Sequence, residues 1–359
     1  MATNRLSEQQ AELLSLLRSK MIGRTKVHTI QWPSYIGVKS LGSSIINRKV
    51  CFHLGHQAVT SNMQTDASSF EGWAVVVFSW LKEGKGVQVE MSWDDPGGFD
   101  LNSQQQRNQY RHYQRYLYRV IRFREMFDWF VVAPESESLL SESQVLFPDG
   151  RLKEKSFFLN SGQQEIRNKT SIICDKAFGD LSEDCLEMLF IHNKNSLMQC
   201  AFGNSAQTLM RQFPVGVFKG EVTNNCSISG QGMPIFTGGK SAIDLWAVGN
   251  GRAAIFELKK PSGNKKVGIV SELIFYANIV RDLQLKNLKY KNPKPFEAQL
   301  IDSVGVDSYF LLGEGNIHPL LNSKAIFDCL NDSGRKRDIK FDIIYYNNLL
   351  ECRKEDWKE

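Results

Sequence analysis

The spacing of apolar residues in the first half of the chain predicts a mixture of helices and strands. Apolar residues recur at helical intervals after Ser7, and Ser7 with Gln10 fits a capping box. In chain order, the pattern predicts a helix over 7–21, short strands and loops within 26–60, a hairpin pairing 73–80 with 86–93, a helix over 103–127 and a strand over 130–133. Residues 1–165 are therefore expected to form an α+β domain.

The second half alternates strand-like and helix-like stretches, after a polar segment over 134–170 that suggests a domain boundary near residue 165. In order, the pattern predicts a helix over 182–192, strands near 215–223, 241–248 and 252–259, a helix over 268–283, a strand over 306–313, a helix over 319–331 and a strand over 339–346. Residues 166–359 are thus expected to form an α/β domain with a mixed sheet flanked by helices.

Two apolar runs on either side of Asn250-Gly251 form the strongest hairpin signal in the chain. A two-residue loop places Gly249 opposite Arg252, and a four-residue loop keeps the same register, whereas a three-residue loop would shift it by one. Counting back from the turn, Asp244 then faces Glu257. Lys259 projects from the same face as Glu257, because side chains alternate along a strand.

Two facing carboxylates inside apolar strands need a compensating charge. Directly opposed residues lie about 4.5–5.5 Å apart, and like charges there repel. A divalent cation held by Asp244 and Glu257 would offset this repulsion, and oxygen ligands suit Mg²⁺ or Mn²⁺. Lys259 could orient an attacking water and stabilise charge on a phosphate. The alternative interpretation is a surface hairpin with a cross-strand charge pattern.

Asp244, Glu257 and Lys259 resemble the active-site hairpin of the PD-(D/E)XK nuclease superfamily, with Ile243 in place of the proline. The resemblance implies a restriction-endonuclease-like core of helix, three strands, helix and strand. It also implies metal-dependent hydrolysis of nucleic acid, most often DNA, in restriction, phage defence or repair. Asp244 and Glu257 would be the metal ligands, and Lys259 would be the water-positioning base or electrostatic stabiliser. Residues 1–165 would then recognise the substrate or a partner.

Three further residues match features of that superfamily. Glu272 and Tyr276 share one face of the next predicted helix and resemble the Gln-x-x-x-Tyr motif of RecB-like nucleases, with Glu in place of Gln. Tyr276 is equally well explained as a core aromatic residue. Glu187 could match an acidic residue on the first helix of some members, although such a residue is more often simply solvated.

The net charge of +5 is shared between the halves and does not by itself indicate nucleic-acid binding. Local patches are the better candidates. Arginines repeat every four residues in the helix expected over 103–127, interleaved with tyrosines, which suits phosphate contacts and base stacking; they are Arg107, Arg111, Arg115 and Arg119. The alternative is a solvated arginine face. Lys240, after two glycines, is another possible phosphate contact.

The remaining composition limits the class of protein. The chain contains no run of about 18 uncharged apolar residues, so no membrane-spanning helix is expected. Seven cysteines without a Cys-x-x-Cys pair suggest reduced thiols and a cytoplasmic location.

Two rival functions stay open: an inactive nucleic-acid-binding or regulatory module on a nuclease-like fold, and an RNA nuclease. A homo-oligomer is also compatible with the sequence. The order of hairpin, helix and strand in the first domain echoes the second, either as a degenerate copy or by coincidence.

Overall fold

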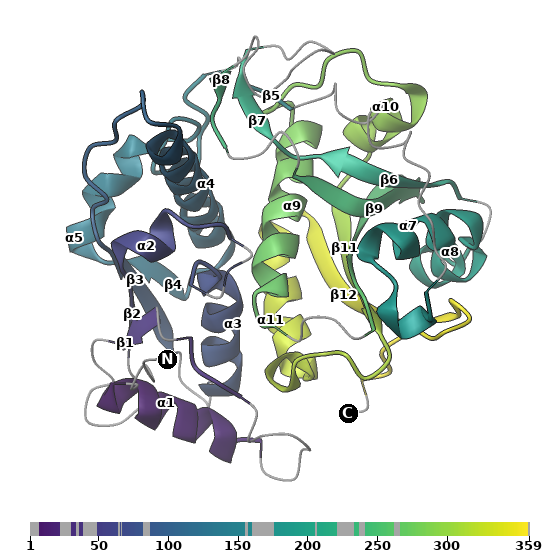
Figure 1. Ribbon diagram of the computed structural model, residues 1–359, viewed down its shortest axis with the longest axis horizontal. Helices are drawn as coiled ribbons and strands as arrows, with labels where there is room; N and C mark the ends of the chain where they lie inside the picture. Colours follow the sequence, from purple (N-terminus) through teal and green to yellow (C-terminus); the bar gives the residue numbers. More distant parts are fainter. Residues whose placement is uncertain are drawn as a thin grey trace. The chain divides into compact units, whose positions relative to one another are not determined.

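The computed structural model describes residues 7–21, 30–33, 36–38, 49–63, 65, 67–81, 87–154, 157–159, 176–204, 207–220, 233–236, 241–261 and 266–357. Contacts divide the chain into two compact units (Figure 1). The first contains the chain up to Lys153 together with segments 266–271 and 318–333, and the second contains the rest. The boundary expected near residue 165 lies outside the described residues.

The first unit is built on a four-stranded sheet in the order β1-β2-β3-β4. Strands β1 and β2 are antiparallel, whereas β2, β3 and β4 run parallel. Its elements are α1 (Glu8–Ser19), β1 (Ile36–Val38), β2 (Lys49–Leu54), α2 (His56–Val59), α3 (Phe70–Leu81), β3 (Gln88–Trp93), α4 (Gln104–Met126), β4 (Phe130–Val132), α5 (Pro134–Glu137) and the short 3₁₀ helix η2 (Ser138–Glu142). The capping box of Ser7 and Gln10 is confirmed at the start of α1.

The hairpin expected over 73–93 is wrong, because its first half is helix α3. The apolar run from Phe70 to Leu81 is longer than an ordinary strand, and nearly every residue in it is buried. The three consecutive valines Val75, Val76 and Val77 favour a strand locally, but burial on all sides removes the alternation that a half-exposed strand would show.

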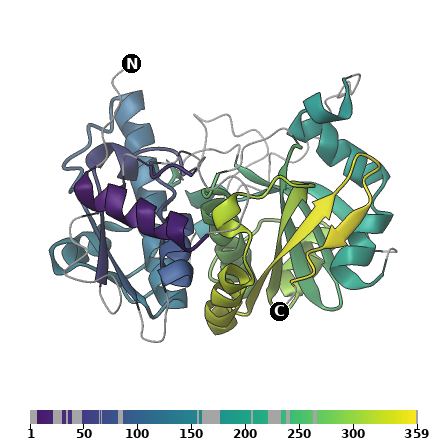
Figure 2. The same cartoon turned by 90° about the horizontal axis from the view of Figure 1, so that it is seen from below.

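The second unit contains a six-stranded mixed sheet in the order β13-β12-β11-β10-β9-β6, with β12 and β13 in yellow at one edge (Figure 2). The unit also contains a separate three-stranded sheet in the order β5-β7-β8. The elements are β5 (Phe157–Leu159), η3 (Phe178–Asp180), α7 (Glu183–His192), α8 (Asn195–Phe202), β6 (Leu209–Pro214), β7 (Val217–Lys219), β8 (Met233–Pro234), β9 (Ala242–Gly249), β10 (Arg252–Lys259), α9 (Ile269–Gln284), α10 (Pro295–Asp302), β11 (Val306–Gly313), β12 (Ile339–Tyr346) and β13 (Cys352–Lys354). Between β11 and β12 the chain forms η4 (Pro319–Leu321), α11 (Lys324–Gly334) and η5 (Arg335–Arg337).

The predicted mixed sheet flanked by helices is confirmed, and helices α8 and α10 are additions that the apolar pattern missed. The strand expected near 215–223 is wrong for this sheet, because its edge strand is β6, over 209–214, and β7 belongs to the small sheet. One face of the sheet packs on α7 and α8 through a cluster that includes Leu186, Phe190, Leu197 and Phe256. Alternation along β10 sends Ala254, Phe256 and Leu258 to that face, and therefore turns Glu257 and Lys259 to the other.

The predicted hairpin register is confirmed. Gly249 pairs with Arg252, and the regular ladder runs as far as Leu245 with Phe256, one step before Asp244 and Glu257. Beyond it, the Leu258 backbone N–H donates to Asp244 Oδ2. Asn250 and Gly251 have φ values of 51° and 74°, the left-handed pair that a two-residue type I′ turn requires. The turn chemistry visible in the sequence therefore sets which side chains meet at the far end of the hairpin.

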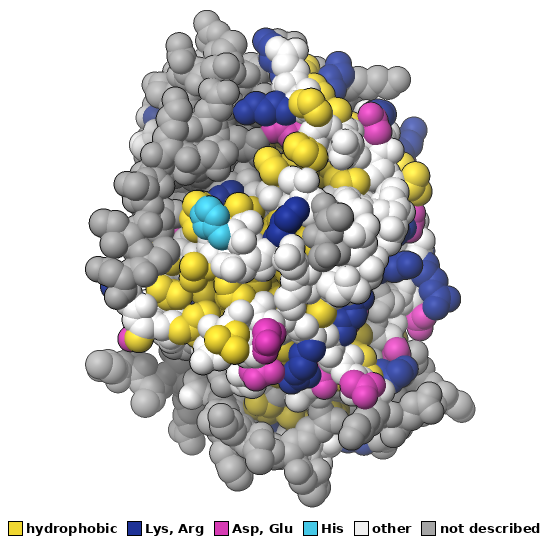
Figure 3. Space-filling model, turned by 90° about the vertical axis from the view of Figure 1, so that its right-hand side faces the viewer, with side chains coloured by type: hydrophobic (Ala, Val, Ile, Leu, Met, Phe, Trp, Pro, Cys, Tyr) yellow, Lys and Arg dark blue, Asp and Glu magenta, His cyan; other side chains and the backbone are white. Residues whose placement is uncertain are grey.

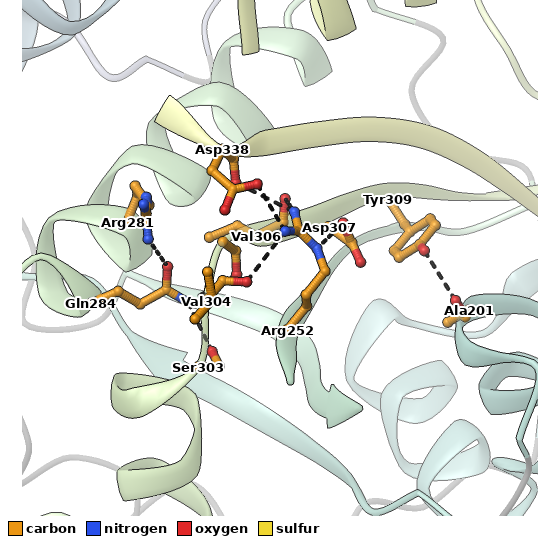
Figure 4. A network of polar contacts seen from close by, with 11 residues as sticks. Ala201, Arg252, Arg281, Gln284, Ser303, Val304, Val306, Asp307, Tyr309 and Asp338 are labelled. Atoms are coloured by element: carbon orange, nitrogen blue, oxygen red, sulfur yellow. Dashed lines mark hydrogen bonds and ion pairs between the residues drawn. The ribbon is translucent and has the colours of Figure 1, made fainter. Parts of the chain in front are cut away.

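At the turn end of the hairpin, Arg252 ties the beginnings of three parallel strands together (Figure 4). Its guanidinium Nε lies 2.9 Å from Asp307 Oδ1, and Nη1 lies 2.8 Å from Asp338 Oδ1. It also donates to the carbonyl oxygens of Val304 and Val306. Gly305 fits beneath this network because a Cβ there would lie 2.4 Å from Arg252 Nη1.

We predict that Gly305→Ala lowers the free energy of unfolding by about 1–3 kcal/mol, because the alanine must adopt a φ of +75° and displace the Arg252 guanidinium. Gly203→Ala is the matched control, since Gly203 has a φ of +67° with no neighbouring atom within 4 Å of the added Cβ. Chemical denaturation should show a larger loss for Gly305→Ala. Equal losses would mean that displacing the Arg252 guanidinium does not lower the free energy of unfolding.

Candidate active site

The end of the β9–β10 hairpin brings together the carboxylates and the lysine that the sequence singled out. The backbone N–H of Leu258 donates to Asp244 Oδ2 at 2.9 Å, which holds the Asp244 carboxylate against β10. Lys259 Nζ lies 2.5 Å from Glu257 Oε1. Asp244, Glu257 and Lys259 therefore form one compact group, with Glu257 only 3% exposed.

Helix α9 adds a third carboxylate to this group. Glu272 Oε2 lies 3.4 Å from Lys259 Nζ, and Glu272 is 4% exposed. Tyr276, one turn further along α9, is buried near the charges of Glu257 and Glu272. Burial, followed by the Glu257 charge, raises the pKa of Tyr276 well above its usual value. Both α9 residues noted from the sequence thus lie at the hairpin end, where Tyr276 is also part of the core.

Glu257 and Glu272 are buried, whereas Asp244 and Lys259 are half-buried, so three acidic groups and one lysine lie close together with little access to water. Burial raises the pKa of Asp244 to about 8, and burial together with Glu272 raises the pKa of Glu257 well above its usual value. Burial alone would lower the pKa of Lys259, but the surrounding carboxylates outweigh it and raise that pKa. Lys259 therefore keeps its ammonium proton at neutral pH, and its charge, together with the proton that Asp244 retains below about pH 8, offsets the repulsion within the group.

Two carboxylate oxygens in this group lack a hydrogen-bond partner among the described residues. They are Glu257 Oε2 and Glu272 Oε1, and both atoms are buried. Buried polar oxygens are usually satisfied, so an unpaired one at such a site calls for a missing donor or cation. Within the described ranges, however, no three His, Cys, Asp or Glu side chains already converge to hold a metal ion.

Helix α7 carries Glu187, for which the sequence indicated a functional role only weakly. Glu187 is 2% exposed, so the expectation of a solvated residue is wrong. Arg211 Nε lies 2.8 Å from Glu187 Oε2, and Gln212 Nε2 lies 2.7 Å from each Glu187 oxygen. Burial raises the pKa of Glu187 to about 7, and its charge in turn raises the pKa of Asp244. Arg211 and Gln212 were missed because nothing in their local sequence marks them.

The arginine stripe on α4 divides into two parts. Arg119 is 3% exposed and forms an ion pair with Glu71, with Nη2 to Oε2 at 2.5 Å, and Arg115, also 3% exposed, binds the Asn62 side chain. Neither residue lies on a solvated face. Arg107 and Arg111 are partly exposed and are the members that a ligand can reach. Lys240 lies outside the described residues.

The described surface shows no single basic face in the direction drawn in Figure 3, where Lys and Arg side chains are scattered among Asp and Glu.

In the described part of the chain, no helix is long and apolar enough to cross a membrane. Comparisons with protein-family models, curated proteins and solved structures find no match. The candidate function therefore rests on the residues of the site itself.

The raised pKa of Asp244 predicts a pH-dependent stability. Between about pH 4 and about pH 8 the folded chain keeps a proton that the unfolded chain has released, so this contribution is complete in acid and lost as pH rises through about 8. In EDTA, the free energy of unfolding should fall on the order of 1–3 kcal/mol from about pH 5 to about pH 9, and Asp244→Asn should flatten the fall. Urea denaturation at several pH values measures this. Parallel curves for the two proteins would contradict it.

Proposed function

We propose that this chain is a nuclease that hydrolyses phosphodiester bonds of DNA with the aid of Mg²⁺ or Mn²⁺. The observation that carries the proposal is the meeting of Asp244, Glu257 and Glu272 with Lys259 at the end of one hairpin. Bringing these acidic groups together costs free energy, because like charges are held close to one another with little access to water. A protein that keeps such a group in spite of the cost is a candidate for using it.

The donor set fits a hard divalent cation. Asp244 and Glu257 would hold it, with Glu272 beside them, and the unpaired oxygens of Glu257 and Glu272 are ligands of the kind that Mg²⁺ and Mn²⁺ prefer. When bound, the cation would supply a Lewis acid to the phosphodiester.

Lys259 is best suited to electrostatic stabilisation. Its pKa is raised, so it holds its proton at neutral pH and is a poor base. Its ammonium can donate to a phosphate oxygen and hold the attacking water in line, which favours the charge that develops in the transition state. Of the two roles that the resemblance implied for Lys259, the structure supports the stabiliser.

The element order supports a restriction-endonuclease-like core. Helix α7, strands β6, β9 and β10, helix α9 and strand β11 occur in the order helix, three strands, helix and strand, with α8, β7, β8 and α10 inserted between them. Asp244 and Glu257 lie on the paired strands β9 and β10, and Glu272 lies in the first turn of α9. Restriction, phage defence and repair are all processes in which such an activity would serve.

A second candidate is a nucleic-acid-binding or regulatory module that does not cut. It is favoured by one observation: no three acidic or histidine side chains converge as a ready metal site within the described residues. Incubation of the purified protein with plasmid, linear duplex DNA and RNA, in Mg²⁺, Mn²⁺ or EDTA, separates the candidates. Metal-dependent cutting of DNA supports the proposal, cutting of RNA alone favours an RNA nuclease, and binding without cutting favours the module.

We predict that Lys259→Met lowers the single-turnover cleavage rate by about 10²-fold or more, since one electrostatic stabiliser is removed. DNA affinity should change little, because the ammonium acts mainly in the transition state. Lys260→Met is the matched control, as the neighbouring lysine stands outside the carboxylate group, and it should cut at the wild-type rate. Unchanged cleavage by Lys259→Met would remove the hairpin end as the active site.

The divided arginine stripe predicts two different outcomes. Arg107→Ala with Arg111→Ala should weaken DNA binding and reduce the slope of log affinity against log salt by up to about 0.9 for each lost phosphate contact. Arg119→Ala should instead lower the free energy of unfolding by about 3–5 kcal/mol, because it leaves Glu71 buried without its partner. Salt-dependent binding and denaturation curves test the pair. An unchanged salt slope in the double variant would exclude this face of α4 from DNA binding.

A further inference from the structure

Strand β6 departs from regular alternation next to the candidate active site. Arg211 pairs with Leu245 and Phe213 pairs with Ile243, so Gln212 stands opposite Asp244. In a regular strand, Arg211 and Gln212 would point to opposite faces of the sheet. Both side chains instead reach the same carboxylate on α7, that of Glu187.

The backbone at Gln212 explains how this happens. Its φ is +60°, in the left-handed region that a non-glycine residue seldom adopts. A local twist of this kind re-aims a side chain, as bulges near active sites do. Gln212 is only 7% exposed, so the conformation is enclosed by the protein and held there. Strained backbone of this sort persists where the surroundings require it, and it is often found at functional sites.

The carboxylate that these two residues hold lies near Asp244, because Gln212, which binds it, stands opposite Asp244 in the strand register. The charge of Glu187 adds to the effect of burial in raising the pKa of Asp244. Arg211 and Gln212 donate hydrogen bonds to both Glu187 oxygens. Without the guanidinium and the amide, the Glu187 side chain could adopt other rotamers. The position of the negative charge that Asp244 experiences is therefore set by β6.

We propose that Arg211 and Gln212 are positioning residues, which fix the Glu187 carboxylate beside Asp244 and so set the acidic arrangement that receives the divalent cation. This inference rests on the proposed function, because it concerns the same site. Residues that orient ligand groups from behind typically change metal affinity or activity by about 10–100-fold when they are replaced. A purely structural link between β6 and α7 would change stability but not metal affinity.

Gln212→Gly separates the two roles, since glycine adopts a φ of +60° without strain and lacks the amide. We expect this variant to bind Mn²⁺ about 10–100-fold more weakly than wild type in a calorimetric titration, with a melting temperature lowered only by the loss of the amide hydrogen bonds to Glu187. Gln212→Ala should lose the same Mn²⁺ affinity and melt at a lower temperature than Gln212→Gly, because alanine is strained at this φ. Cleavage by both variants should recover towards the wild-type rate at saturating Mn²⁺.

Gln284→Ala is the matched control, because Gln284 is a similarly buried glutamine of the same unit that binds the carbonyl oxygen of Gly305 and the Ser303 hydroxyl, away from the carboxylates. It should lose stability and keep its Mn²⁺ affinity. Wild-type Mn²⁺ affinity in Gln212→Gly, with metal binding intact in wild type, would overturn the positioning role alone. Absence of Mn²⁺ binding by the wild-type protein would overturn the proposed metal centre, and this inference with it.

Discussion

The ion pair between Lys259 and Glu257 is the interaction on which the rest of the site depends. Three carboxylates, those of Asp244, Glu257 and Glu272, would repel one another in this enclosed place without the ammonium among them. Desolvation opposes every charge in the group, and mutual attraction offsets it only because the hairpin register brings the groups within contact. The arrangement is thus a consequence of strand pairing as much as of residue type.

The two units share an order of strand pairing but differ in their charges. Each has an antiparallel pair followed by two parallel strands, β1-β2-β3-β4 in the first and β9-β10-β11-β12 in the second. Glu71, early in α3, is neutralised by Arg119 from within its own unit. Glu272, early in α9, keeps one buried oxygen without a partner among the described residues. The same framework therefore encloses a completed ion pair in one case and an unsatisfied acidic group in the other.

Opposite ends of β10 perform different tasks. At its beginning, Arg252 binds Asp307 and Asp338, and so locks the parallel strands in register by charge and hydrogen bonds that are complete. At its end, the charges of Glu257 and its neighbours are only partly balanced. The end of β10 whose charges are fully paired thus supports the end whose charges are only partly balanced.

The sequence alone determined the elements and register that bring the candidate site together. The Asn250-Gly251 turn and its flanking apolar runs were sufficient to place Asp244 beside Glu257, because the turn type fixes the pairing and the pairing fixes the face. Helical spacing likewise placed Glu272 and Tyr276 on one face of α9. These relations depend only on residues that are close in the sequence, so turn chemistry and helical spacing are enough to predict them.

Only the tertiary structure decided which charges are compensated. Arg115 and Arg119 look like members of a solvated stripe until α4 is seen to be buried along most of its length. The 73–93 segment reads as a hairpin because valines favour strands, but packing on all sides makes its first half a helix. Gln212 meets Glu187 through one unusual backbone angle. Each of these outcomes depends on partners distant in the chain, which no local pattern can identify.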